Sequence, residues 1–121
     1  MSERDFRLYL ADILESGKAI LEFTDNMSFQ EFSNDRKTCS AVIREFAIIG
    51  EAVGKLPDGV KQNHPDIEWQ DIKDFRNLLI HEYFGVDQEI LWKAIRDDLP
   101  PLLSEVSGIM NETYPSFAVP K

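Results

Sequence analysis

The feature that most constrains the fold of this chain is a stretch from Trp69 to Phe84 that no glycine or proline interrupts. Gly85 follows directly, which is typical of a helix that ends at this point. At about 100° per residue, the apolar side chains of this stretch spread over more than half of the helix circumference. A helix this apolar is expected to be buried, either inside a helical bundle or between subunits.

Arg76 lies on a stripe of this predicted helix that is otherwise apolar or aromatic and that also carries Tyr83. An unpaired charge is costly in such surroundings. The arginine is therefore expected either to pair with a carboxylate, such as Asp71 or Glu82, or to line a cleft. In a cleft, a guanidinium group could hold a phosphate or stabilise developing negative charge.

His81 falls in the last turn of the predicted helix, four residues after Asn77, so these two side chains are expected to be neighbours. The helix dipole favours a protonated imidazole at this end, and histidine changes charge near neutral pH. With Arg76 and the phenol of Tyr83, His81 could form a set that cleaves phosphodiesters without a metal ion. Because short motifs also match by chance, the alternative is that His81 only caps the helix or hydrogen-bonds.

The rest of the chain is predicted to form further helices. Apolar residues recur at helical spacing over about 4–25, over 36–55 and from about 88 onward. Shorter helical turns are expected over about 28–33 and before Asn63. A heptad-like apolar seam in the helix over 36–55 favours packing at a small crossing angle. The predicted fold is therefore an all-α, antiparallel up-and-down helical bundle of four main helices plus short extra helical turns.

Small and rigid residues add detail to this prediction. Gly50 and Gly54 are four residues apart, which would allow a neighbouring helix to approach closely. Pro100 and Pro101 lack backbone N–H groups and are expected to kink or restart the last helix. One helical domain is predicted over residues 1–110, followed by an extended C-terminal tail over 111–121. Because one small bundle cannot cover the whole apolar surface of the central helix, the chain is expected to be a homodimer.

The net charge of −9 argues against a general nucleic-acid-binding surface, because such surfaces are basic. RNA binding would require cations concentrated in a cleft, namely Arg76 with help from residues such as Arg7, Arg36 or Arg44. No group of cysteine and histidine residues has zinc-ligand spacing, and no glycine-rich phosphate loop is present. Neither a metal nor a cofactor is therefore expected.

The single cysteine, Cys39, cannot form an internal disulfide, which favours a reducing cytoplasmic location. Cys39 has no evident catalytic partner and is expected to be a structural thiol. The polar N-terminus predicts no signal peptide. No apolar run approaches the length that crosses a membrane.

The spacing Arg76-Asn77-x-x-x-His81-x-Tyr83 resembles the signature of the HEPN superfamily, specifically the HepT-like toxin proteins. The resemblance extends in order and spacing over about residues 2–103. It implies that Arg76 and His81 are the ribonuclease residues, with Asn77 commonly included in the site. It also implies a dimer and a partner nucleotidyltransferase antitoxin that adds AMP to Tyr83.

The function that this resemblance implies is that of a toxin in a toxin–antitoxin system, a metal-independent endoribonuclease acting on RNA such as tRNA or mRNA. His81 would transfer protons, Arg76 would stabilise charge on the phosphate, and Asn77 would orient His81 or the substrate. A second hypothesis is a non-catalytic binding partner that a nucleotidyltransferase modifies. A third is an inert dimeric bundle in which Arg76 and His81 only pair with carboxylates.

Overall fold

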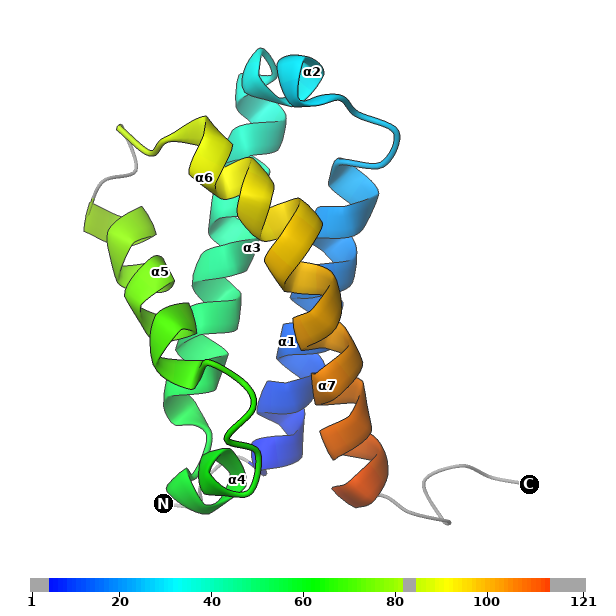
Figure 1. The fold of residues 1–121 in the computed structure, drawn as a ribbon, viewed down its shortest axis with the longest axis vertical. Coiled ribbons are helices and arrows are strands. Elements are labelled where there is room, and N and C mark those ends of the chain that lie inside the picture. Colours follow the sequence, from blue (N-terminus) through cyan, green and yellow to red (C-terminus); the bar gives the residue numbers. More distant parts are fainter. Residues whose placement is uncertain (1–4, 82–84, 114–121) are drawn as a thin grey trace.

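The structure is a computed structural model that describes residues 5–81 and 85–113 (Figure 1). These two ranges contain helices and loops but no strand, which confirms the predicted all-α class. The longer helices are α1 (Phe6–Phe23), α3 (Arg36–Lys55), α5 (Trp69–His81) and α7 (Leu99–Thr113). The shorter elements are α2 (Phe29–Ser33), α4 (Asp58–Gln62), α6 (Gln88–Lys93) and a π-helical segment, η1 (Ala94–Asp98).

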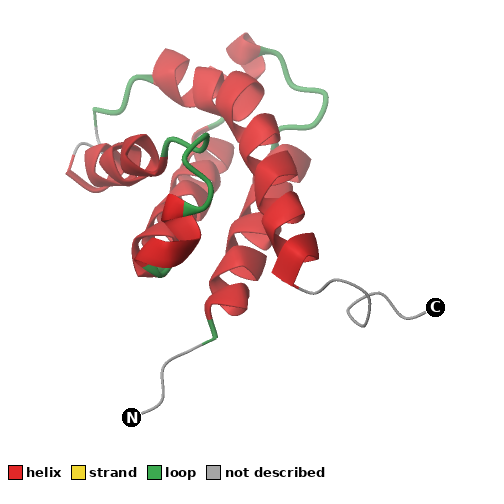
Figure 2. Ribbon diagram, turned by 60° about the horizontal axis from the view of Figure 1, so that its bottom comes forward, coloured by secondary structure: helices red, strands yellow, loops and turns green. Residues whose placement is uncertain are grey.

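The longer helices lie lengthwise along the molecule and run in alternating directions (Figure 1). α1 and α3 pack against each other, α5 packs mainly on α3, and α7 packs mainly on α1. α6, η1 and α7 follow one another as a continuous helical rod, which Figure 2 shows from a second direction. α5 and this rod therefore have different principal neighbours.

Side-chain caps fix where α2, α3 and α6 begin, and these helices start close to the predicted starts at about 28, 36 and 88. Asp35 accepts a 3.0 Å hydrogen bond from the backbone N–H of Thr38 at the start of α3, and this bond lowers the pKa of the Asp35 carboxyl. Ser28 and Glu31 form a reciprocal capping box that starts α2. Asp87 caps α6 by accepting a hydrogen bond from the backbone N–H of Glu89.

In the C-terminal rod, the α-helix restarts at the two prolines as the sequence predicts, but its end differs from the prediction. Pro100 and Pro101 occupy the first turn of α7, where a missing N–H is tolerated, and the irregular segment is the π-helical turn that precedes them. The helix then continues to Thr113. The predicted boundary at residue 110 is therefore wrong for residues 111–113, which are helical, while residues 114–121 lie outside the described ranges.

The core lies between α1 and α3 and extends to α6, η1 and α7. The apolar seam predicted on the helix over 36–55 is buried, which confirms it. Phe32 is completely buried, and its ring centroid lies 5.1 Å from that of Trp92. The seam residues are Val42, Phe46, Ile49, Val53 and Leu56.

Cys39 is a buried residue of this core. Its Sγ lies 3.2 Å from the backbone oxygen of Phe32, to which it donates a hydrogen bond. Burial raises the pKa of the Cys39 thiol, so the reactive thiolate is disfavoured. The prediction of a structural thiol is confirmed. Over the described ranges, no helix is both long and apolar enough to cross a membrane.

Candidate active site

α5 carries the candidate residues and is less buried than its composition predicts. Its buried residues are Trp69 and Leu79, whereas Leu78 and Ile80 remain 41% and 46% exposed. Trp69 fixes the start of the helix, because its indole N–H donates hydrogen bonds to the backbone oxygens of His64 in the preceding loop (3.0 Å) and of Lys61 in α4 (3.2 Å). The bundle of one chain therefore leaves part of the apolar surface of α5 open to solvent.

Arg76 points from α5 back onto α3, where Gly50 leaves room for its side chain. A Cβ atom at position 50 would lie 2.2 Å from the Cβ and 2.5 Å from the Cγ of Arg76, so any larger residue would collide with it. The sequence predicts a close approach of helices at Gly50 and Gly54 but does not indicate which residue fills the space. At Gly54 the nearest atom, the Cε of Lys73, is 4.0 Å away, which is an ordinary contact.

The guanidinium of Arg76 has few partners. Its Nη1 donates a 3.2 Å hydrogen bond to Oδ1 of Asn77. Its Nε is buried and has no hydrogen-bond partner among the residues that the structure describes. Within the same residues no ion pair joins Arg76 to Asp71, and Glu82, the other predicted partner, lies outside them. Within the described part of the chain, the side chain of Arg76 is therefore held by packing against α3 and not by an ion pair. The pairing with Asp71, one of the predicted alternatives, is not formed.

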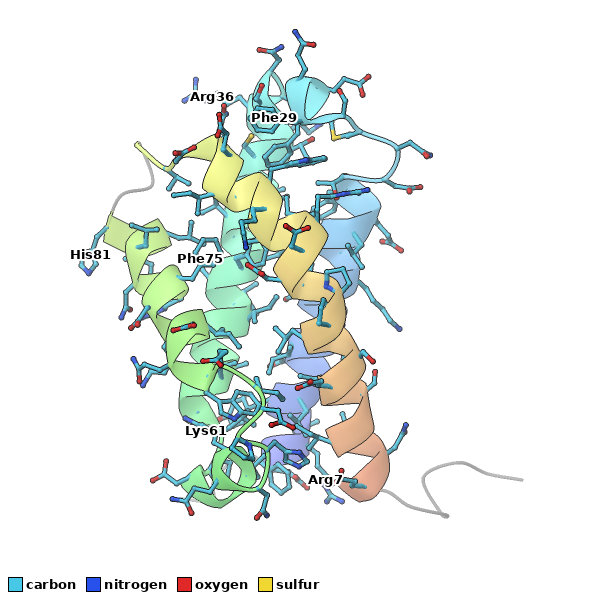
Figure 3. All side chains as sticks on the ribbon, viewed as in Figure 1. Arg7, Phe29, Arg36, Lys61, Phe75 and His81 are labelled. Carbon is cyan, nitrogen blue, oxygen red and sulfur yellow. The ribbon has the colours of Figure 1, made fainter. Side chains whose placement is uncertain are left out.

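His81 is exposed and points away from the bundle at the end of α5 (Figure 3). Asn77 is also exposed, and its amide oxygen accepts the hydrogen bond from Arg76. On an ideal helix, positions five apart diverge by about 140°, and accordingly Arg76 and His81 face different sides of α5. One chain thus joins Arg76 to Asn77 by a hydrogen bond. His81 lies one turn beyond Asn77 on the same exposed face of α5, and among the described residues no hydrogen bond joins it to Arg76. Tyr83 lies outside the described residues.

Two of the cations expected to help Arg76 lie next to carboxylates of their own, Arg7 beside Asp5 and Arg44 beside Glu45. Arg7 lies near the bottom of the molecule in Figure 3, away from His81 at the left edge, and its guanidinium pairs with Asp5 at 2.5 Å. The guanidinium of Arg44 is largely exposed, and its Nη1 lies 3.7 Å from the carboxylate of Glu45. In the described part of the chain, no group of three or more His, Cys, Asp or Glu side chains could hold a metal ion.

The protein is therefore an all-α protein. Its candidate site consists of an arginine, an asparagine and a histidine on one helix, α5. The family described as ribonuclease HepT-like matches residues 13–109 of this chain. The chain therefore belongs to the ribonuclease HepT-like family, which confirms the resemblance inferred from its motif and places it among ribonucleases.

Individual relatives agree with this assignment. A protein of Thermococcus cleftensis named probable ribonuclease HepT is 45% identical over 100 residues, which cover 83% of this chain and 91% of the relative. A protein of Methanocaldococcus jannaschii named putative RNase is 40% identical over 112 residues, covering 93% of each chain. No solved structure matches the chain significantly.

Proposed function

We propose that this protein is a metal-independent endoribonuclease that acts as a homodimer and forms the toxin component of a toxin–antitoxin system. The observation that carries this proposal is the state of Arg76. Its guanidinium is seated against Gly50, with no carboxylate paired to it among the described residues and a buried Nε that lacks a partner. Because no carboxylate neutralises the guanidinium of Arg76 among the described residues, this group can still bind a phosphate.

A second copy of the chain would complete the site. On a helical wheel, Leu78 and Ile80 lie on either side of the face that carries Asn77 and His81, and both apolar residues are substantially exposed. Burying them between two α5 helices would remove apolar surface from water. It would also bring His81 of each subunit toward the arginine of the other. Two guanidinium groups in one cleft would concentrate positive charge there, despite the net charge of −9 on each chain.

The proposed reaction is an internal transesterification of RNA. The 2′-oxygen forms a bond to the adjacent phosphorus while the bond from phosphorus to the 5′-oxygen breaks. A general base takes the 2′-hydroxyl proton, and a general acid returns a proton to the departing 5′-oxygen. His81 would carry out proton transfer. Arg76 would stabilise the charge on the phosphate oxygens. Asn77, whose amide oxygen accepts a hydrogen bond from Arg76, would orient the guanidinium group. The products carry a 2′,3′-cyclic phosphate and a 5′-hydroxyl.

The antitoxin in this proposal is a nucleotidyltransferase that adds AMP to Tyr83 in the cytoplasm. The resemblance of the Arg76-to-Tyr83 motif supports this part. AMP on the phenol would add bulk and negative charge seven residues from Arg76. Negative charge near a phosphate-binding guanidinium would hinder entry of an RNA phosphate.

Replacement of His81 by alanine should reduce cleavage of total RNA by about 10²–10⁴-fold, which is the usual contribution of a general acid or base. Because His81 is exposed in the single chain, the variant should fold as the wild type does. Gln70→Ala, at another exposed position of α5, is the matched control and should cleave normally. RNA cleavage is followed on gels, with circular dichroism as a check of folding.

Equal cleavage by the wild type and His81→Ala would remove His81 from the mechanism. An absence of cleavage by a folded wild-type dimer would favour the second function, a non-catalytic partner of a nucleotidyltransferase. The intact mass of the purified protein would then be measured first, because AMP already present on Tyr83 would also silence the enzyme.

A further inference from the structure

A groove separates α5 from the rod formed by α6, η1 and α7, and it does not include the candidate active site. Its volume is about 600 Å³. Side chains of α3, α5 and the rod line it, and Arg76, Asn77 and His81 are not among them. The groove exists because its two walls rest on different helices, α5 on α3 and α7 on α1.

The floor of the groove is apolar. Phe46 of α3 and Phe75 of α5 meet there edge to face, with ring centroids 5.2 Å apart. Ile90 of α6 borders the floor with 48% of its surface exposed. Partly buried side chains of both walls continue this surface, so a partner could cover it without displacing the core. The other apolar lining residues are Ile49, Ile67, Ile72, Ala94, Leu99, Pro101 and Leu102.

The rim of the groove is strongly acidic. Six exposed carboxylates line it, three from the loop and first turn at the start of α5 and three from the rod: Asp66, Glu68, Asp71, Asp97, Asp98 and Glu105. Among the described lining residues the one cation is Lys93, whose Nζ lies 3.5 Å from Oδ1 of Asp98. The two walls therefore present negative charge on both sides of an apolar floor.

We infer that this groove binds an amphipathic helix of another protein, with apolar side chains against the floor and lysine or arginine along both edges. A helix of this kind would satisfy both features of the groove, because the apolar face adds affinity and the flanking cations match the carboxylates. RNA does not fit, since its phosphates would be repelled. A second copy of this chain would bring the same acidic surface to the interface, which electrostatic complementarity disfavours.

The test uses the full-length protein and a synthetic helical peptide with leucine on one face and lysine on the other. Its control peptide has glutamate in place of lysine. Binding is measured by calorimetry at physiological salt for the wild type and for the double variant Asp97→Lys/Glu105→Lys. A second double variant, Glu15→Lys/Glu22→Lys, makes the same change of net charge at exposed positions of α1 outside the groove.

The groove double variant should bind the lysine peptide about tenfold more weakly or worse, as expected when close complementary charges are reversed. The α1 double variant should bind within about twofold of the wild type, because distant exposed charges are screened. Ile90→Asn, which leaves the charge unchanged, should also weaken binding. RNA cleavage by these variants should remain at the wild-type level, so failure here is distinct from failure of the ribonuclease proposal.

Three results would overturn the inference. If both double variants lost binding equally, the lysine peptide would be attracted by the net charge of the protein and not by the carboxylates of the groove. Binding of the glutamate peptide as tight as that of the lysine peptide would show that the carboxylates do not select the partner. A change in the oligomeric state of Asp97→Lys/Glu105→Lys, measured by light scattering, would show that a second copy covers the groove.

Discussion

Replacement of Gly50 by alanine should lower both the free energy of unfolding and the rate of RNA cleavage. The added Cβ would lie 2.2 Å from the Cβ of Arg76. This atom is attached to the backbone of α5 and cannot rotate away, as the end of a long side chain could, so α5 would have to shift from α3. Overpacking of this kind costs about 1–3 kcal/mol. A displacement of about 1 Å at a catalytic group can cost about 10²-fold in rate.

Gly54→Ala is the matched control, because Gly54 lies one turn further along the same helix. Its new Cβ would lie 4.0 Å from the Cε of Lys73, so no atom has to move. Because Gly54 is a helical residue in the last turn of α3, alanine there should raise the free energy of unfolding by up to about 0.5–1 kcal/mol and leave cleavage unchanged. Urea unfolding and RNA cleavage are measured for both variants. Identical behaviour of the two would show that Gly50 does not seat Arg76.

Replacement of Arg76 by methionine should abolish most of the activity without destabilising the protein. Methionine fills a similar channel against Gly50 but removes the buried Nε that has no partner among the described residues. Relief of an unsatisfied polar group should leave the free energy of unfolding unchanged or raise it by about 1 kcal/mol. Loss of the group that stabilises the phosphate should reduce cleavage by about 10²–10³-fold.

The hypothesis of an inert bundle predicts the reverse result for Arg76→Met. If Arg76 served only to pair with a carboxylate, its removal would leave that carboxylate unpaired and lower the stability. A variant with lower stability and unaltered cleavage would therefore contradict a catalytic role. Urea unfolding and cleavage by the same preparation separate the two results.

Much of the fold could be predicted because the signals that determine it are local. The predicted bounds of α3 agree with the structure, since Asp35 caps its start and its apolar seam keeps a regular spacing. α2 begins where Ser28 and Glu31 form a capping box, within the range of about 28–33 that the sequence predicts. These features depend on residues within one or two turns of each other, and a sequence records them directly.

The site was predicted less completely, because it depends on how helices pack. The motif identified Arg76, Asn77 and His81, and the helix places Asn77 and His81 on one face as the spacing predicts. The spacing gave no sign that Asn77 would also accept a hydrogen bond from Arg76. The seating of Arg76 on Gly50 joins residues of two helices, and no local pattern specifies that pair. The acidic groove likewise combines three segments that are distant in sequence.

The measurement that tests the central claim most directly is end-group analysis of RNA cleaved by the purified wild-type protein in the presence of EDTA. The proposed mechanism predicts that cleavage continues and that the new ends are 2′,3′-cyclic phosphate and 5′-hydroxyl, because the 2′-oxygen is the nucleophile and His81 moves the protons. Cleavage that stops in EDTA, or that yields 3′-hydroxyl and 5′-phosphate ends when magnesium is restored, would contradict the account.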